Sequence, residues 1–510
     1  MNSDSQHREH IGIDFGTTNI SVTGLIVDSE LKEAIPVRYE EDGVPFPSIL
    51  SISQGDNGKL IVKYGRQVKS TIAALEEQGE RIIKSIKTEA TDENYIFEIF
   101  GTKYKSTAII GSLIKKIKAY IGRYENHQCD ITEATIAVPV DFSLAQRRML
   151  QKAFEKAGIK VNKIINESTA AYISNRDSVA NLSNIMVFDW GGGTLDISLL
   201  NIDKSNGRIN ELATNGWPMA GDKIDEIIAE YLHKKLIKSG EYNIDVGYKE
   251  LSSKDKMKII SEAEKVKINS FGDEDSIDEE AIVFMFDYCG EKKVRCNIDY
   301  DTFHELLKKA IGEAIALIQT VLNKANMSVK MLDAIIMVGG TSKLLPLRQY
   351  IEEKIEKKHG IRIVYPEHVQ WSVSEGAAII DMLDCGYALN QDINVLLSDG
   401  TMFPVLEKEL QIPITDNVVS FGTTDNAESA NFVFCDDKEN LLTRKSINSK
   451  GYDGEGYEVK AKIDNDLIAQ ITLSCKYPLP GEAAVSFEIG SLNYYYDISK
   501  IDNYKYREDV

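Results

Sequence analysis

Positive charge, cysteine and long apolar runs are all scarce in this sequence of 510 residues. Lys and Arg number 59 against 79 Asp and Glu, so the formal net charge is −20. A field of that sign repels phosphate backbones and anionic lipid, which disfavours a main role in nucleic-acid binding or at a membrane surface. A small anion in a cleft is not excluded, because the net charge describes the surface as a whole.

Cysteine is limited to six residues, and no two of them form a C-x-x-C pair. The spacing suggests neither a zinc site nor a disulfide framework, so we expect buried thiols and a reducing, cytoplasmic location. No stretch reaches the roughly 18 uncharged apolar residues of a membrane span. Residues 1–10 are polar and have no apolar centre, so we do not expect a secretory signal there.

The pattern of the chain changes near residue 390. Before it, short apolar strands alternate with long amphipathic helices, which predicts an α/β fold. After it, period-two alternation between Gly, Asn and Asp turns predicts a β-sandwich. At about 150 residues per domain, the first part is large enough to be bilobed. We predict an α/β domain over 1–389, a linker over 390–400 and a β-rich domain over 401–510.

Three segments share one construction, an apolar strand that runs into a glycine turn lined with hydroxyls. They are Ile11–Asn19, Met186–Asp196 and Ile335–Ser342. The first two share Asp-x-Gly, and each is followed by another alternating strand, so each turn should be the tip of a β-hairpin. A dinucleotide-binding turn would instead lead into a helix. The sequence also has no G-x-x-x-x-G-K-[ST] motif, which excludes a P-loop.

These residue types suit a nucleotide with its metal ion. Glycine lets the backbone point N–H groups at phosphate oxygens, and threonine hydroxyls add further donors. An aspartate at the end of each strand could hold Mg²⁺ through waters, since that ion keeps most of its water shell. One glycine hairpin alone is more simply a tight turn. The same spacing in both halves favours a Mg-nucleotide clasped between two lobes.

Taken together, the segments resemble the actin-like ATPase fold and, specifically, the seventy-kilodalton heat-shock chaperone family. The similarity runs from Ile11 and continues, more faintly, to about Ile498. Four further segments support it: Thr135–Pro139 with Ala145–Arg148, Lys163–Ala171, Leu212–Gly216 and Gly376–Ala378. Actin and the sugar kinases share the two hairpins but not this full series.

The resemblance implies ATP or ADP with Mg²⁺ as cofactors, and K⁺ as a further candidate ion. Lys84 matches the family's lysine near the γ-phosphate, although a lone lysine is otherwise more simply a surface charge. Glu167 matches the carboxylate that holds the water shell of the metal and couples the nucleotide to the other domain. Thr17 and Thr194 match hydroxyls beside the attacked phosphorus and the lytic water. The expected catalytic residues are Lys84, Glu167, Thr194, Asp189 and Asp14, and the expected metal residues are Asp14, Asp189, Asp196 and Glu167.

The nucleotide-binding set implied by the same resemblance comes from the three turns and two helices. It comprises Gly16, Thr17, Thr18, Asn19, Gly191, Gly192, Gly193, Thr194, Gly221, Glu264, Lys267, Gly339, Gly340, Thr341, Ser342 and Lys343. In the family, Glu264 and Lys267 would bracket the adenosine, and residues 340–343 would close over the base. Without the family, Glu264 and Lys267 are most simply a surface ion pair, since they are three apart on one helix.

Two departures from the family concern the coupling and the client site. Ser168 replaces the proline that follows the key glutamate, which leaves the strength of interdomain coupling open. Met402–Pro413 resembles a segment that normally follows the first strand and loop of the peptide-binding sandwich, but only Gly400 and Thr401 separate it from Asp399. Two residues cannot hold a strand and a returning loop. We therefore expect an incomplete peptide cleft, and no helical lid.

The resemblance implies a cytoplasmic ATPase that slowly hydrolyses ATP to ADP and phosphate. Hydrolysis would switch the β-rich domain between client-binding states through the apolar strip Val395–Asp399. Unfolded peptide would be the client, with a J-domain cochaperone and a nucleotide-exchange factor as further partners. The incomplete cleft keeps a second interpretation open, a nucleotide-gated ATPase with one dedicated protein partner. A small-molecule kinase or a filament-forming actin relative gives no role to residues 400–510 or to the linker.

Overall fold

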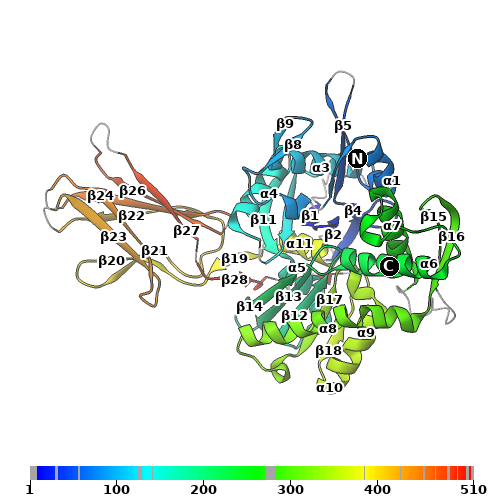
Figure 1. Ribbon diagram of the computed structural model, residues 1–510. Helices are drawn as coiled ribbons and strands as arrows, with labels where there is room; N and C mark the ends of the chain where they lie inside the picture. Colours follow the sequence, from blue (N-terminus) through cyan, green and yellow to red (C-terminus); the bar gives the residue numbers. More distant parts are fainter. Residues whose placement is uncertain are drawn as a thin grey trace, which may run out of the picture.

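The molecule consists of a bilobed α/β part and an elongated β part that extends away from it (Figure 1). The structure, a computed structural model, describes residues 9–28, 33–55, 58–84, 86–124, 129–140, 142–270, 282–383, 385–424, 427–451, 454–465, 467–478, 483–490, 492–500 and 505–506. This arrangement confirms the predicted fold class. None of the described helices is long and apolar enough to cross a membrane.

Lobe I is built on a seven-stranded sheet of order β11-β10-β1-β2-β3-β29, with β4 paired to β2. Its strands are β1 (His10–Phe15), β2 (Asn19–Asp28), β3 (Glu33–Tyr39), β4 (Phe46–Pro47), β10 (Glu133–Val138), β11 (Lys160–Asn166) and β29 (Lys505–Tyr506). Helices α3 (Ser106–Ile121) and α4 (Leu144–Lys156) share an apolar core with this sheet. Helix α4 begins at the predicted capping box, in which the backbone N–H of Gln146 donates to Ser143 Oγ.

A smaller subdomain extends lobe I beside the main sheet. It contains a three-stranded sheet of order β6-β5-β7 and the hairpin β8-β9. Its elements are β5 (Ile49–Gln54), β6 (Leu60–Tyr64), α1 (Arg66–Glu77), β7 (Arg81–Lys84), α2 (Ile86–Glu89), β8 (Ile96–Ile99) and β9 (Thr102–Lys105).

Lobe II is built on a second seven-stranded sheet, of order β18-β17-β12-β13-β14-β28-β19. Its strands are β12 (Asn184–Trp190), β13 (Leu195–Asp203), β14 (Arg208–Trp217), β17 (Ala334–Val338), β18 (Arg362–Val364), β19 (Gly386–Leu389) and β28 (Tyr494–Asp497). Its helices and its outer hairpin are α6 (Gly221–Ser239), α7 (Ser253–Ser270), β15 (Ile282–Tyr288), β16 (Glu291–Ile298), α8 (Tyr300–Lys324), α9 (Leu345–Ile351) and α10 (Lys357–His359).

Two helices, α5 (Glu167–Ser174) and α11 (Ser372–Leu383), lie against each other between the lobes. Their backbones approach closely because two glycines have no side chain. A Cβ on Gly376 would lie 1.9 Å from the carbonyl oxygen of Ala170, and a Cβ on Gly12 would lie 2.0 Å from that of Ser374. Helix α11 therefore packs directly on both α5 and β1, and no larger residue fits at either glycine.

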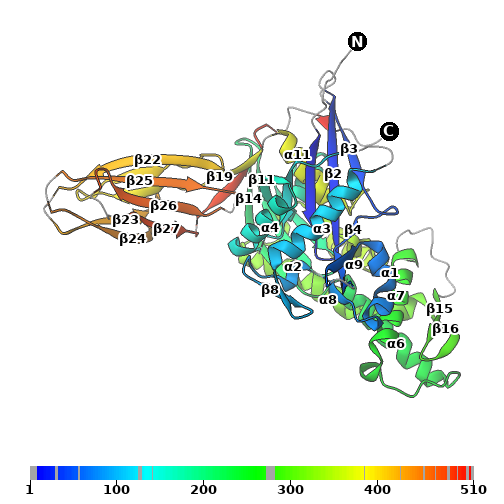
Figure 2. The ribbon, with the colours of Figure 1, turned by 90° about the horizontal axis from the view of Figure 1, so that it is seen from above.

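The β part is a sandwich of two four-stranded sheets, of orders β21-β20-β23-β24 and β22-β25-β26-β27. Its strands are β20 (Ile393–Leu396), β21 (Met402–Leu406), β22 (Ile414–Gly422), β23 (Ser429–Cys435), β24 (Leu441–Asn448), β25 (Gly456–Ile463), β26 (Ala469–Cys475) and β27 (Val485–Ile489). Figure 2 shows that this part stays well separated from both lobes except at its base. At that base its apolar core is continuous with the core of lobe II.

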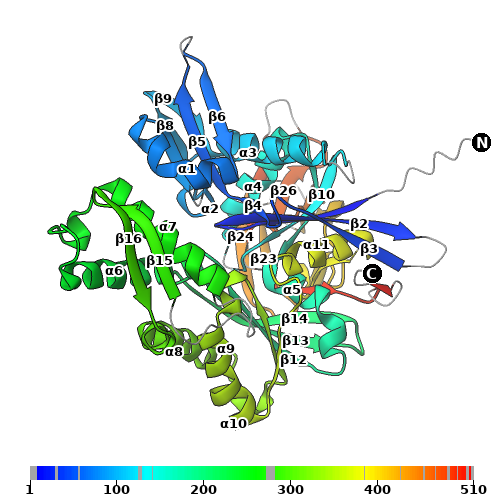
Figure 3. The same ribbon diagram turned by 90° about the vertical axis from the view of Figure 1, so that its right-hand side faces the viewer.

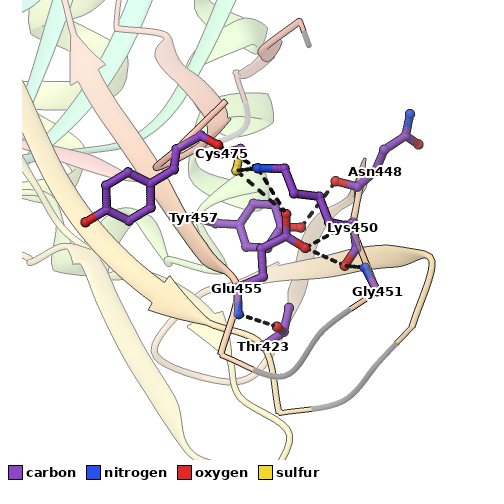
Figure 4. A network of polar contacts seen from close by, with 9 residues as sticks. Thr423, Asn448, Lys450, Gly451, Glu455, Tyr457 and Cys475 are labelled. Atoms are coloured by element: carbon purple, nitrogen blue, oxygen red, sulfur yellow. Dashed lines mark hydrogen bonds and ion pairs between the residues drawn. The ribbon is translucent and has the colours of Figure 1, made fainter. Parts of the chain in front are cut away.

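A buried carboxylate fixes the far loop of the sandwich (Figure 4). Glu455 accepts hydrogen bonds from Ser449 Oγ and from the backbone N–H of Lys450, both at 2.7 Å. The ammonium of Lys450 donates to the carbonyl oxygen of Tyr477 at 2.6 Å and lies 3.6 Å from the sulfur of Cys475. Burial by itself would raise the pKa of Glu455. The hydrogen bonds from Ser449 Oγ and from the backbone N–H of Lys450 nevertheless hold that pKa below its usual value.

The residues predicted to be a linker form the first strand of the sandwich instead. Strand β20 pairs with β21 and with β23, and Val395 is only 3% exposed. Gly400 has φ of 83°, which allows the tight turn between β20 and β21. The strand predicted to be missing from the sandwich is therefore present. The apolar strip predicted to be a linker forms it, as β20. The connection from lobe II runs over residues 390–392.

The end of the chain also differs from the predicted domain boundary. Strand β28 pairs with β14 and β19 in lobe II, and β29 pairs with β3 in lobe I. The β part thus ends at about Ile489, and the chain then returns to the α/β part. The physical reason is that Tyr495 and Tyr496 are buried against lobe II, which a short strand without sheet partners could not achieve.

A pair of adjacent substitutions tests the place of β20. Val395→Asp should destabilise the sandwich by several kcal/mol, because it buries a carboxylate without a partner. Leu396→Asp should have little effect, because Leu396 is 40% exposed. Thermal unfolding followed by circular dichroism measures both. Equal melting temperatures for the two variants would show that this strip is not part of the sandwich core.

Candidate active site

The two predicted hairpins form, and their tips meet between the lobes. β1 pairs with β2 and β12 pairs with β13, both antiparallel. A Cβ on Gly192 would lie 2.4 Å from Thr18 Oγ1, and a Cβ on Gly193 would lie 2.5 Å from Thr17 Cγ2. Only glycine allows this approach, so the hydroxyls of one hairpin face the bare backbone of the other. Backbone N–H groups and hydroxyls together suit phosphate oxygens.

The tip of the first hairpin closes tightly. A Cβ on Gly16 would lie 2.3 Å from the carbonyl oxygen of Asn19. Asn19 itself is the first residue of β2 and pairs with Pro47 of β4. The predicted run Gly16–Asn19 is therefore one compact turn.

Buried and partly buried carboxylates gather directly behind the two tips. Burial, and then the charge of Glu167, raise the pKa of Asp14 to about 8, although Lys87 opposes the shift. Burial, and then the charges of Glu167, Asp14 and Asp196, hold the pKa of Asp189 well above its usual value. Acidic groups therefore outnumber cations here, and they come from both lobes.

Lys87 is the cation of this cluster. Its ammonium lies 2.7 Å from Glu167 Oε1, and its side chain is 5% exposed. Burial by itself would lower the pKa of Lys87, but the carboxylates of Glu167 and Asp14 outweigh it and raise the pKa. Lys87 therefore stays charged although its side chain is buried.

Lys84, the predicted catalytic lysine, lies elsewhere. It is the last residue of β7, and its side chain is exposed. Burial raises the pKa of Asp222, and Lys84 is one of the lysines whose charge opposes that shift. Lys87 was not predicted from the sequence. Lys84 and Lys87 each follow isoleucine in the same short segment, so the local sequence does not distinguish them. The end of β7 and the start of α2 between them decide which lysine enters the cluster.

The cluster fits a hydrated metal ion. Asp14 Oδ1 and Thr18 Oγ1 are buried and have no hydrogen-bond partner among the residues that the structure describes. Within that same part of the chain, no group of three or more His, Cys, Asp or Glu side chains is arranged to hold a metal directly. Carboxylates that lie near one another without converging on one point suit an ion that keeps its waters, as Mg²⁺ does.

The third glycine turn supports the hairpin of lobe II. Gly339 has φ of 79°, and a Cβ there would lie 2.5 Å from Asp189 Oδ1. Thr341 Oγ1 donates to the carbonyl oxygen of Gly191 at 2.7 Å, and Ser342 Oγ donates to that of Gly339. Gly340 and Lys343 lie in the same 3₁₀ turn, Gly340–Lys343. This turn therefore fixes the position of Asp189 and of the glycine run beside it.

The first turn of α6 holds the same hairpin from another side. The backbone N–H groups of Gly221 and Asp222 donate to the carbonyl oxygens of Gly191 and Gly192, at 3.1 and 2.8 Å. Lys267 of α7 donates to the carbonyl oxygen of Gly221 at 3.0 Å. The third glycine turn, the start of α6 and Lys267 of α7 thus come together around the glycine run Gly191–Gly193.

Glu264 and Lys267 do not pair with each other. Glu264 pairs with Lys69 of α1 at 2.7 Å, and Lys267 pairs with the buried Asp225 of α6 at 2.7 Å. A second ion pair, Lys254–Glu77 at 2.6 Å, also joins α7 to α1. Figure 3 shows α1 and α7 facing each other where the two lobes meet. Glu264 is therefore part of a bridge between the lobes.

A family model described as Hsp70 protein matches residues 59–442. The chain belongs to the Hsp70 family. The match includes Lys87, Glu167, the hairpin of lobe II and the first strands of the sandwich. Hsp70 proteins are ATPases of the chaperone type, so ATP and ADP are the expected ligands of the hairpin tips. The predicted family is confirmed.

The pKa of Asp14 predicts how the stability of the Hsp70 protein without nucleotide and metal depends on pH. An acid whose pKa is raised from 3.8 to about 8 by folding stabilises the protein fully below about pH 4. That stability is lost as the pH rises through about 8, where the buried carboxyl must ionise. Asp14→Asn should therefore reduce the loss of melting temperature between pH 5 and pH 8.5.

Asp203→Asn is the matched control for this experiment. The pKa of Asp203 is lowered by hydrogen bonds from Ser205 and Asn206, so its contribution is lost on acidification instead. Its substitution should leave the loss between pH 5 and pH 8.5 unchanged. If Asp14→Asn behaves in the same way as this control, Asp14 is not the raised carboxyl.

The two lysines give a second test. Lys87→Ala should slow ATP hydrolysis by about 10²–10³, the usual loss when one preorganised charge is removed. Lys84→Ala should leave the rate near that of the parent, because Lys84 is exposed and lies outside the carboxylate cluster. Single-turnover kinetics with saturating ATP measure the rate. A slow Lys84 variant beside a normal Lys87 variant would restore the assignment made from the sequence.

Proposed function

We propose that this protein is an ATP-dependent chaperone-type Hsp70 that slowly hydrolyses ATP and thereby switches its β part between client-binding states. The observation that carries the proposal is the Lys87–Glu167 pair, which lies among buried carboxylates behind two facing hairpin tips. Such a site is arranged for phosphoryl transfer to water, which needs positioning and charge stabilisation more than covalent chemistry.

Each part of the site would have a separate role in hydrolysis. The backbone N–H groups of Gly191–Gly193 and of Gly16–Thr18 would donate to phosphate oxygens. Bound Mg²⁺ would supply positive charge at the β- and γ-phosphates. Asp14, Asp189 and Glu167 would hold the waters of that ion, with Asp196 beside them. Thr194 and Thr17 would orient the attacking water, and Lys87 would stabilise the negative charge that develops.

The adenosine would lie between α7 and the third turn. Glu264 and Lys267 would bracket it on one side, and Gly340–Lys343 would close over the base on the other. The ion pairs Lys69–Glu264 and Lys254–Glu77 join the lobes at this place. Lys254 and Glu77 are exposed, and Lys69 and Glu264 are partly exposed. Water and salt screen such pairs, so they can open for nucleotide exchange.

The β part offers apolar surface to a client. Phe403 is 44% exposed and begins a series of edge-to-face aromatic contacts through Phe421 and Phe432 to Tyr457, with ring centroids 5.6 to 5.9 Å apart. Val418 on the edge strand β22 is also exposed. An extended apolar peptide could add to such an edge and cover these side chains.

A panel of unfolded peptides tests the client site. ATP turnover should rise when apolar extended peptides are added, and Phe403→Asp should remove most of that rise while the basal rate stays unchanged. Thr472→Asp places the same charge on another face of the sandwich and should keep the response. If no peptide changes the turnover of wild-type protein, the alternative of one dedicated protein partner is preferred.

A J-domain cochaperone, a nucleotide-exchange factor and a cytoplasmic location complete the proposal. All six cysteines are free, which agrees with a reducing compartment. Addition of a J-domain protein should raise ATP turnover further when peptide is present.

A further inference from the structure

Strand β28 closes the joint between the β part and lobe II. It lies between β14 and β19, where Ile209 pairs with Tyr496 and Tyr387 pairs with the same residue from the other side. The rings of Tyr387 and Tyr496 pack edge to face, with their centroids 5.1 Å apart, and Tyr496 is 2% exposed. The joint is therefore a packed piece of sheet and not an open connection.

The β part is held to lobe II at both of its ends. The chain leaves at β19 and returns at β28, and the backbone N–H of Asn390 donates to the carbonyl oxygen of Asn493 at 2.9 Å. The side-chain oxygen of Gln391 accepts two further hydrogen bonds from Asn493, at 3.1 and 2.7 Å. Undocking of a single linker cannot release a domain that is attached in this way.

One carboxylate on β14 reaches from this joint towards the nucleotide site. Glu211 accepts hydrogen bonds from Ser168 Oγ at 3.1 Å and from Thr169 Oγ1 at 2.7 Å, as well as from the amide of Asn166. These three residues flank Glu167, the partner of Lys87.

The other neighbour of Glu211 belongs to the joint. The hydroxyl of Tyr387 is buried, and after burial the charge of Glu211 is the largest cause that raises its pKa, while Arg147 opposes the shift. Tyr387 packs against Tyr496 of β28. Glu211 thus lies between the start of α5 in the cleft and the aromatic pair in the joint.

We propose that Glu211 is a positioning residue that holds the start of α5 around Glu167 and connects it, through β14, to a joint closed by β28. A change at Glu167 would then reach the β part through a shift of this joint, with no release of a linker. The kinetic half of this proposal rests on the proposed ATPase function. The structural half, the link between Glu211 and β28, does not.

The test combines kinetics with hydrogen exchange on the full chain. Glu211→Gln should lower kcat for ATP hydrolysis by about 10-fold or more, typical for loss of an outer contact, with KM for ATP nearly unchanged. The same variant should speed backbone hydrogen exchange over Tyr494–Asp497 even without nucleotide. Ser168→Ala removes a single donor and should show the same two effects in weaker form, and Glu211→Asp should recover part of both.

Glu488→Gln is the matched control, since Glu488 bridges the β part to Arg148 at an exposed contact. It should change neither kcat nor the exchange of β28. The proposal is overturned if Glu211→Gln exchanges like wild type over Tyr494–Asp497, or if it lowers only the melting temperature. If wild-type protein does not hydrolyse ATP but Glu211→Gln still loosens β28, the proposed function fails and the joint stands.

Discussion

A crowded cluster of acidic side chains between the lobes is the constraint on which the rest of this molecule depends. Asp14 and Asp189 come from different lobes, and their charges act on each other and on Glu167 away from water. Lys87 is held between them by Glu167 at 2.7 Å. An excess of buried carboxylates opposes folding unless counter-charge is present, so such a cluster is retained for what it binds. The Mg-nucleotide of the proposed function would supply a positive ion to this cluster.

Close backbone packing is what keeps these charges together. The hairpin tips can meet only because Gly192 and Gly193 have no side chains, and α11 can lie on α5 and β1 only because of Gly376 and Gly12. Contacts between backbones leave little freedom for adjustment, since packed interiors behave as rigid bodies. The two lobes are therefore held closely at the hairpin tips, and partly exposed ion pairs join them at α1 and α7.

The joint with the β part bears on both functional alternatives. A client chaperone and an ATPase with one dedicated partner each need the nucleotide site to affect the sandwich. With β19 and β28 side by side in one sheet, lobe II offers a direct path for that influence. The exposed aromatic and apolar side chains of the sandwich favour an apolar client, and the same surface could serve a single partner.

The sequence alone determined the family, the α/β and β-rich parts of the fold, and the two glycine hairpins whose tips meet between the lobes. These features follow from local rules. Alternating apolar residues and glycine turns predict hairpins, and Ser143 with Gln146 predicts the start of a helix. The carboxylates stand at the ends of predicted strands. Each of them depends on residues that are neighbours along the chain. The Asp-x-Gly spacing was informative because it stands at the end of an apolar strand in both lobes.

Tertiary structure alone decided three further points. Whether Lys84 or Lys87 enters the cluster depends on where β7 ends and α2 begins, and the lysines have the same local propensity. Whether the strip at Val395 is a linker or a strand depends on its pairing with β23, which lies far along the sequence. The return of β28 to lobe II depends on β14, almost 300 residues earlier. Local pattern cannot fix such pairings, because the free energy that selects a strand's partner comes from burial between segments that are distant in sequence.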